Sequence, residues 1–312
     1  MHYVVGDVHG CFDELMLLLN KIEERDKEAR FIFVGDFIDR GPKVMPVLRW
    51  ARANITPDGE YQSVLGNHEA GVIDWYYEFL AWWKKCEAGE DSIPMPKTHY
   101  DFSKLMDGAN MLTPEKLEPV IDFFKSLPYS KTIEIETVFG KKVTYRIVHA
   151  AYDYNEEKDS EKQKNSNIWE RNYWGYPRNN YNDEIVIHGH TPTIDVDYLA
   201  RGYMSDAPGM IGYRQNDINV DGGCCYLHSS WDAPCMLCAI CLETLEEFYP
   251  YSVEERFVQM WESTVEYDSE DEYAVKMYYK ERAAEFCKRY CEKEPRARKD
   301  ILIKMGKETE EK

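Results

Sequence analysis

The sequence predicts an α/β fold, because short apolar segments of strand length alternate with segments of helical spacing over residues 2–70. Strands and helices that alternate in this way form parallel sheets with covered faces. Short polar motifs also follow the predicted strands, and ligands of α/β proteins bind beyond the carboxyl ends of parallel strands. The sequence therefore predicts a sheet whose strand ends carry a functional site.

The first elements can be assigned in order. A strand is predicted at residues 2–6, and residues 12–22 follow with apolar side chains at helical spacing. The second strand is residues 31–35, after which Pro42 opens a helix, since proline lacks only an N–H that would have no partner in the first turn. Residues 61–65 are the third strand. This order predicts the start of a parallel sheet.

Residues 70–128 are predicted to form a helical insertion beside the site, because aromatic side chains recur there at helical spacing. The aromatic cluster at residues 75–83 is interpreted as core packing rather than as a substrate platform. Residues 132–149 predict a strand hairpin, and residues 153–183 have the polar composition of loops. Further strands are predicted at residues 184–187, 217–221, 225–228, 236–242 and 247–251.

Two parts of the chain are expected to differ in role. Residues 1–251 are predicted to form one catalytic domain, and residues 252–312 a charged helical extension that packs on the domain or trails from it. Residues 254–294 are interpreted as an amphipathic pair of packing helices rather than as a docking arm for a partner.

Composition excludes several classes of protein. Hydrophobic residues make up 44% of the chain and aromatic residues 14%, enough for a packed core. The net charge of −19 argues against a nucleic-acid backbone as partner. Neither a membrane span nor a signal peptide is predicted, because the apolar runs have strand length and a strand already begins at His2. With an odd nine cysteines, we expect reduced thiols and a cytoplasmic protein.

Six polar segments carry the chemistry, and each is placed where a buried strand should end. They offer carboxylate, imidazole and amide side chains together with two arginines. The segments are Gly6-Asp7-Val8-His9-Gly10, Gly35-Asp36-Phe37-Ile38-Asp39-Arg40-Gly41, Gly66-Asn67-His68-Glu69, Val148-His149-Ala150, Ile168-Trp169-Glu170-Arg171 and His188-Gly189-His190-Thr191.

This inventory is typical of a dinuclear metal site. Two divalent ions about 3.5–4 Å apart need one carboxylate between them and oxygen or nitrogen donors on each side. Asp36, at the end of the second strand, is the natural bridge. Mixed oxygen and nitrogen ligands without thiolates suit Mn²⁺, Fe or Zn²⁺ better than Ca²⁺. The other candidate ligands are Asp7, His9, Asn67, His149 and His190.

The motifs resemble those of the phosphoprotein phosphatase family within the calcineurin-like metallophosphoesterases, in its bacterial and phage-type branch. The family signature GDxHG, GDxxDRG and GNHE is matched by residues 6–10, 35–41 and 66–69, and its later histidines by residues 148–150 and 189–191. The resemblance extends over roughly the first 250 residues. It implies two mixed β-sheets packed as a sandwich between flanking helices.

The resemblance also implies a role for each site residue. It makes Asp7, His9 and Asp36 ligands of the first metal, and Asp36, Asn67, His149 and His190 ligands of the second. Mn²⁺ is expected from bacterial relatives, with Fe or Zn²⁺ as alternatives. A water between the metals would attack phosphorus directly, without a phosphoenzyme.

The remaining roles concern the substrate. The resemblance implies that His68 protonates the leaving alkoxide and that Asp39 orients its ring. The phosphate would be bound by Arg40, Arg171, Asn67 and His68.

The activity predicted first is a metal-dependent phosphomonoesterase acting on phosphoserine or phosphothreonine in proteins. A symmetrical diadenosine tetraphosphate hydrolase is the main alternative; that branch typically lacks the aspartate equivalent to Asp39 and has Asp in place of Glu69. A broad small-molecule phosphatase is a further alternative. A non-catalytic scaffold would be expected to have lost a ligand or His68, and none is missing. Leu65 stands where eukaryotic members have an arginine, so any contact of that arginine is absent.

One other spacing resembles a cofactor motif. Cys235, Cys238 and Cys241 have spacing that suggests an iron–sulfur cluster. However, the segment has the pattern of a buried strand, in which alternation sends Cys238 to the opposite face. We interpret these cysteines, and likewise Cys224 and Cys225, as buried core residues.

Overall fold

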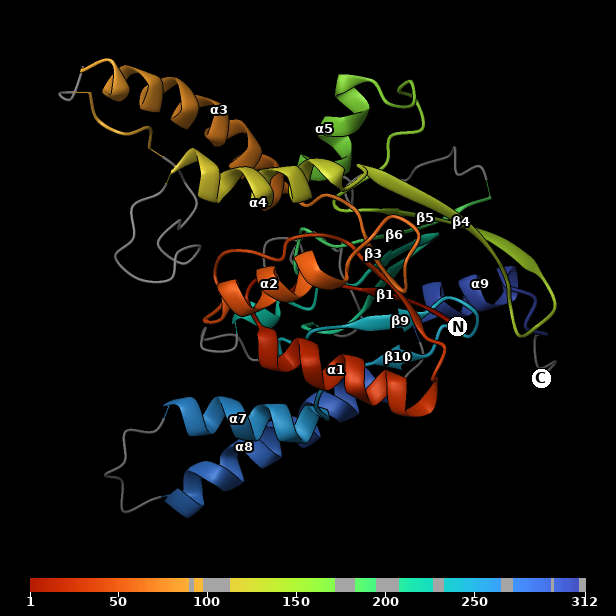
Figure 1. Ribbon diagram of the computed structural model, residues 1–312. Coiled ribbons are helices and arrows are strands. Elements are labelled where there is room, and N and C mark those ends of the chain that lie inside the picture. Colours follow the sequence, from red (N-terminus) through yellow and green to blue (C-terminus); the bar gives the residue numbers. More distant parts are fainter. Residues whose placement is uncertain are drawn as a thin grey trace.

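The structure, a computed structural model, describes residues 1–89, 93–97, 113–171, 183–194, 208–226, 233–264, 272–292 and 295–308. These residues form two five-stranded mixed sheets with helices around them (Figure 1). The predicted α/β class and its two mixed sheets are confirmed. None of the helices described is long and apolar enough to cross a membrane.

The two sheets share one plan, in which three parallel strands are extended by antiparallel neighbours. Strands β1, β2 and β3 are parallel in the first sheet, and β5, β6 and β8 in the second. The first sheet has the order β10 (Glu247–Phe248), β9 (Ala239–Cys241), β1 (His2–Val5), β2 (Arg30–Phe33) and β3 (Tyr61–Ser63). The second has the order β4 (Ser130–Glu136), β5 (Lys142–Val148), β6 (Ile185–His188), β8 (Asp217–Asn219) and β7 (Gly212–Arg214).

Side-chain alternation along the strands divides the core into two layers. Tyr3 and Val5 of β1 join the cluster beneath the helices, whereas Val4 between them joins the cluster between the sheets. A strand directs successive side chains to opposite faces, so one short apolar run serves both layers. Alternation also separates Cys238 from Cys241, as predicted, because Cys238 lies between the sheets and Cys241 on the helical side.

Helices cover the outer face of the first sheet and extend beyond it (Figure 1). The apolar faces of α1 to α4 pack into the same cluster, and α9 packs into the layer between the sheets. The α-helices are α1 (Phe12–Arg25), α2 (Val44–Asn54), α3 (Asn67–Glu87), α4 (Pro114–Ser126), α5 (Glu161–Trp169), α7 (Val253–Thr264), α8 (Glu272–Phe286) and α9 (Arg296–Lys304). Two short helical turns are η3 (Cys224–Tyr226, 3₁₀) and η4 (Cys287–Cys291, π).

The predicted helical insertion is formed by α3 and α4 where it is described; residues 90–92 and 98–112 lie outside the described residues. Its aromatic cluster is core packing as expected, with Trp75, Tyr76 and Phe79 buried. Tyr77 is an exception, because 55% of its surface is exposed.

Two local predictions were wrong, and one strand was missed. Helix α5 lies within the segment predicted as loops, and Ser160 caps it by accepting a hydrogen bond from the Gln163 amide at 3.1 Å. The strand predicted at residues 225–228 begins instead as the turn η3, and its residues 227–228 lie outside the described part. Strand β7 was not predicted, since its three residues include a glycine and an arginine and show no apolar run.

Candidate metal centre

The parallel strands of both sheets deliver the predicted ligands to one place. Asp7 follows β1, Asp36 follows β2 and Asn67 follows β3 in the first sheet. His149 directly follows β5, and His190 lies two residues beyond β6 in the second sheet. All five are buried, with at most 5% of their surface exposed. The sandwich thus brings two sets of strand ends together around a common interior.

Asp36 sits in a tight turn that other residues hold in place. Its φ of 53° lies in the left-handed region, which few non-glycine residues adopt. The buried carboxylate of Glu69 accepts hydrogen bonds from the amides of Asp36, Phe37 and Ile38 at 2.9, 2.8 and 3.3 Å. Gly66 lies against this turn, where an added Cβ would come within 2.3 Å of the Asp36 amide nitrogen. Glu69 and Gly66 therefore fix the direction of the Asp36 side chain.

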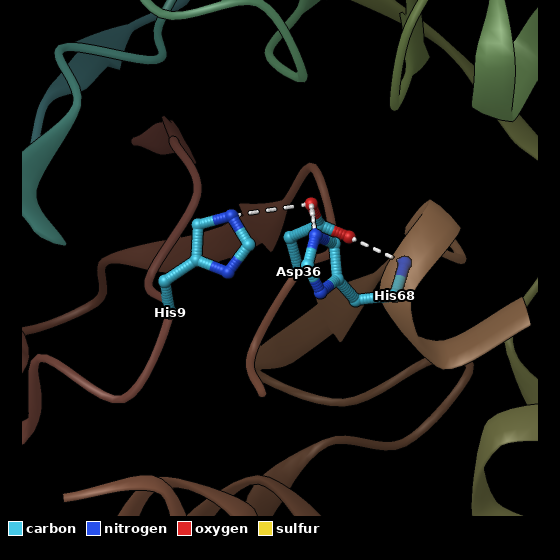
Figure 2. A group of neighbouring side chains, drawn as sticks. All are labelled: His9, Asp36 and His68. Atoms are coloured by element: carbon cyan, nitrogen blue, oxygen red, sulfur yellow. Dashed lines mark hydrogen bonds and ion pairs between the residues drawn. The ribbon is translucent and has the colours of Figure 1, made fainter. Parts of the chain in front are cut away.

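One cluster of possible ligand atoms comprises His9, Asp36 and His68 (Figure 2). His9 Nε2 lies 3.3 Å from Asp36 Oδ2, and His68 Nε2 lies 3.9 Å from the same oxygen. The backbone amide of His68 donates to Asp36 Oδ1 at 3.0 Å. Both oxygens of Asp36 are thereby oriented toward this group.

A second cluster comprises Asp36, His149 and His190, with Asn67 among them. Asn67 Oδ1 lies 2.8 Å from both His149 Nε2 and His190 Nδ1, and these two nitrogens are 3.1 Å apart. His149 Nε2 also lies 3.4 Å from Asp36 Oδ2. Asp36 is thus shared by the two clusters.

The tautomers of two histidines indicate that the clusters are built for cations. His149 Nδ1 lies 2.8 Å from the carbonyl oxygen of Val34, and His9 Nδ1 lies 2.8 Å from that of Ile38. A carbonyl oxygen only accepts, so each Nδ1 donates and each neutral ring keeps its lone pair on Nε2. Those lone pairs face the carboxylate of Asp36, without a proton between them. The residues present therefore fit divalent metal ions.

A buried nitrogen supports the same conclusion. His9 Nε2, which faces Asp36, has no hydrogen-bond partner among the described residues. Burial lowers the pKa of His9, His149 and His190 below the usual value, so these rings are neutral at pH 7. Burial opposes ionisation of Asp36, but the neighbouring His68 ring and the hydrogen bond from the His68 amide hold its pKa below the usual range. Neutral imidazoles and an ionised carboxylate are the forms that bind metals.

Asp7 lies beside the loop that follows β6 of the second sheet. Its carboxylate accepts a hydrogen bond from the His190 amide at 3.1 Å, and an added Cβ at Gly189 would lie only 1.9 Å from Asp7 Oδ1. Burial, followed by the charges of Asp221 and Asp36, raises the pKa of Asp7 well above its usual value. A nearby cation would relieve this crowding of negative charge, which is consistent with the predicted ligand role.

His68, Asp39 and Arg40 form a hydrogen-bonded group at the edge of the first cluster. His68 Nδ1 lies 2.6 Å from Asp39 Oδ2, and Arg40 Nη2 lies 3.3 Å from His68 Nε2. Burial tends to lower the pKa of His68, but Asp36 and Asp39 outweigh it, so the pKa is raised. The His68 side chain is 12% exposed, whereas that of His149 is fully buried.

Arg171 lies near the second cluster, just after α5. Residues 168–171 therefore end a helix and not a buried strand, as was predicted for this segment. Arg171 Nη1 donates to the carbonyl oxygen of His190 at 3.3 Å and to Thr191 Oγ1 at 3.4 Å. The two predicted phosphate-binding arginines are therefore next to different clusters, Arg40 beside His68 and Arg171 beside His190.

Asp221 is a site residue that the sequence reasoning missed. It follows β8, the sixth parallel strand, and is 3% exposed. Burial raises its pKa to about 6, while Arg40 lowers it and the nearby Asp36 raises it further. Asp221 ended a predicted strand and precedes Gly222 and Gly223. An acidic residue and two glycines at a strand end were therefore a readable signal.

Comparison with known proteins agrees with this geometry. A family model described as calcineurin-like phosphoesterase matches residues 3–223. The chain belongs to the calcineurin-like phosphoesterases. Members of this family use a dinuclear site of divalent metals, and the two clusters that share Asp36 fit such a site. The prediction of a metallophosphoesterase is confirmed.

Similar calcineurin-like phosphoesterases include the symmetrical bis(5'-nucleosyl)-tetraphosphatase of Shewanella sediminis, 43% identical over 72 residues, 23% of this chain and 25% of the relative. That of Neisseria gonorrhoeae is 31% identical over 120 residues, 38% of each chain. The match thus spans a quarter to two fifths of these relatives' length. A metallophosphoesterase structure from Sphaerobacter thermophilus superposes with a TM-score of 0.42 and 14% identity, covering 91% of this chain and 98% of that one.

Proposed function

We propose that this phosphoesterase hydrolyses phosphomonoesters with an alkoxide leaving group, such as phosphoserine or phosphothreonine in proteins. The first metal would be held by Asp7, His9 and Asp36, and the second by Asp36, Asn67, His149 and His190. Mn²⁺ is the expected metal in both positions. When bound, two such ions polarise the phosphoryl group and acidify the attacking water.

The observation that carries the proposal is the short contact between His68 and Asp39. The carboxylate of Asp39 accepts from Nδ1 at 2.6 Å, which leaves Nε2 as the atom that can give a proton to the leaving oxygen. Because the pKa of His68 is raised, the ring keeps this proton closer to neutral pH. Such an acid is most useful where the leaving group is strongly basic.

Phosphate binding falls to the two arginines. The Arg40 guanidinium lies 3.3 Å from His68 Nε2, so a phosphoryl group bound by Arg40 would lie next to the proposed acid. Arg171 lies beside His190, near the second cluster. Two guanidinium groups can bind phosphoryl oxygens from separate directions and stabilise their charge in the transition state. Asn67 and His68 would add hydrogen bonds to the same oxygens.

A symmetrical dinucleoside tetraphosphate hydrolase is the second candidate, because the similar relatives carry that name. The presence of Glu69 does little to distinguish the two candidate activities, since this residue is fully buried and supports the backbone around Asp36. Asp39 weighs more. A nucleoside diphosphate leaves as a stabilised anion and needs a proton less than an alkoxide does.

Rates with two substrates would test the proposal. The Mn²⁺-loaded protein is assayed with a phosphothreonine peptide and with diadenosine tetraphosphate, alongside His68→Asn, Asp39→Asn and the control His2→Asn. His2 pairs with Glu243, outside the clusters. We expect faster peptide turnover, reduced in the first two variants and unchanged in the control. Faster turnover of the dinucleotide would favour the second candidate, and no turnover of either would refute both.

A further inference from the structure

Arg256, in the first turn of α7, is a fully buried arginine far along the chain from the metal-binding motifs. A buried guanidinium requires acceptors for its N–H groups. Its Nε donates to the carbonyl oxygen of Pro234 at 3.0 Å, and its Nη2 donates to those of Cys235 at 2.8 Å and Cys224 at 3.4 Å. The side chain thus joins two backbone segments, residues 234–235 and η3.

Charge pairing accounts for only part of this arrangement. Arg256 Nη1 lies 3.4 Å from Glu14 Oε1 and 3.0 Å from Gln259 Oε1, and the Tyr251 ring centroid lies 5.4 Å from its Cζ. The shortest contact is with a backbone carbonyl and not with a carboxylate. Arg256 therefore acts mainly as a multiple donor that fixes the path of the backbone.

The backbone fixed by Arg256 reaches the phosphate-binding group. Cys224, whose carbonyl accepts from Arg256, directs its thiol to the carbonyl oxygen of Asp7 at 3.3 Å. Two residues later in the same turn, the ring centroid of Tyr226 lies 5.4 Å from Arg40 Cζ. Such a cation–π contact restrains the guanidinium. A continuous set of contacts thus runs from α7 through η3 to Arg40.

We propose that Arg256 is a positioning residue that holds η3 so that Tyr226 keeps Arg40 oriented toward the substrate phosphate. This inference rests on the proposed role of Arg40 in binding phosphate. It gives α7, the first helix after residue 252, a part in the active site, although the helix supplies no group that touches the substrate. The metal ligands lie on other elements, and only the backbone carbonyl of Asp7 touches this set of contacts, so metal binding should depend on Arg256 much less than phosphate binding does.

Arg256→Lys is the sharpest test, because lysine keeps the charge but its compact ammonium cannot serve carbonyls in two segments at once. Arg298→Lys is a matched control. Arg298 lies in α9, donates to the carbonyl oxygen of Leu245 at 2.9 Å and stacks near Tyr213, outside this set of contacts. Inorganic phosphate is the probe, and its binding to the Mn²⁺-loaded protein is measured by calorimetry, which requires no turnover.

We expect Arg256→Lys to weaken phosphate binding about 3- to 30-fold, the factor that loss of one cation–π contact would give. Mn²⁺ affinity should change less than phosphate affinity, and phosphate binding in Arg298→Lys should be unchanged. Tyr226→Leu should weaken phosphate binding similarly, and adding Arg256→Lys to it should have no further effect, since both changes remove the same contact.

Additive effects of the two substitutions, or a lower melting temperature in both lysine variants with phosphate affinity unchanged, would overturn the inference. Absence of phosphate binding in the unmodified protein would remove its basis. A protein that binds phosphate but hydrolyses no ester would refute the proposed function alone, because the comparison of Arg256→Lys with Arg298→Lys could still be made.

Discussion

The two ligand clusters share Asp36 but differ in everything around it. His149, His190 and Asn67 form a buried group in which the possible ligand atoms lie 2.8–3.1 Å apart. On the other side, His68 has a partly exposed side chain and hydrogen-bonded contacts with Asp39 and Arg40. The buried group consists of possible ligands, with Arg171 beside His190. The side that holds His68 has both the proposed proton donor and the other proposed phosphate-binding arginine, Arg40.

This difference shows how the carboxylate of Asp36 can belong to two clusters with different surroundings. Parallel strand ends from both sheets hold the proposed ligands. The proposed proton donor His68 and its neighbours Asp39 and Arg40 instead come from the two motifs of the first sheet that contain Asn67 and Asp36. Substitutions on the two sides should therefore have separable effects. Changes on the buried side should remove metal, and changes beside His68 should leave metal bound and slow the reaction.

Asp36→Asn should have the largest effect, because it weakens both clusters together. We expect turnover to fall by at least about 10³-fold, more than the loss of one electrostatic group usually causes. Metal content after dialysis, measured by mass spectrometry, should fall below two ions per chain. Retention of both ions with full turnover would show that Asp36 is not shared between them.

His68→Asn should separate the roles of the two clusters. We expect it to slow turnover about 10²- to 10⁴-fold, the range for loss of a general acid. Metal content should be retained. The loss should be smaller with an aryl phosphate, whose phenolate leaves more easily than an alkoxide. His149→Asn is the matched change on the buried side and should lose metal instead; equal losses of metal in the two variants would contradict the division of roles.

Asp39→Asn should have a smaller effect, about 10- to 100-fold in turnover, as is usual when the partner that orients a histidine is removed. Because the Asp39 carboxylate helps to raise the pKa of His68, its removal should also lower the pKa on the alkaline limb of the pH–rate profile. An unshifted alkaline limb would mean that His68 is not the group that titrates there.

Glu69→Gln should have the smallest effect on turnover, since Glu69 supports the Asp36 turn and belongs to neither cluster. Burial, and then Asp36, raises the pKa of Glu69 from 4.5 to about 7. The contribution of the Glu69 carboxyl to the free energy of unfolding is therefore full below pH 4.5 and is lost as pH rises through about 7. In metal-free protein, the melting temperature of Glu69→Gln relative to the unmodified chain should rise between about pH 5 and pH 7.5. A constant difference would exclude this titration.

The strand ends of the site were predictable from the sequence because their signals are local. A buried strand followed by glycine and an acidic residue identifies Asp7 and Asp36 without any knowledge of the partner sheet. That the strand ends of the two sheets meet at one site could not be predicted from such local signals, since it depends on packing between residues far apart in sequence.

Residues whose role depends on distant backbone could not be predicted. Arg256 lies in a charged segment and has the local pattern of a solvated helix face, but its acceptors are carbonyls about 20 to 30 positions earlier. Helix α5 was missed because its polar sequence has no clear apolar face, although Ser160 carried a capping signal. Only a fixed tertiary environment distinguishes such residues from surface ones.

Asp36 is proposed to lie between two metal ions. Anomalous diffraction from crystals of the Mn²⁺-loaded protein, recorded at the manganese edge, would test it most directly. We expect two peaks about 3.5–4 Å apart, one on the His9 side of Asp36 and the other beside His149 and His190. A single peak, or two peaks that do not share Asp36, would contradict it.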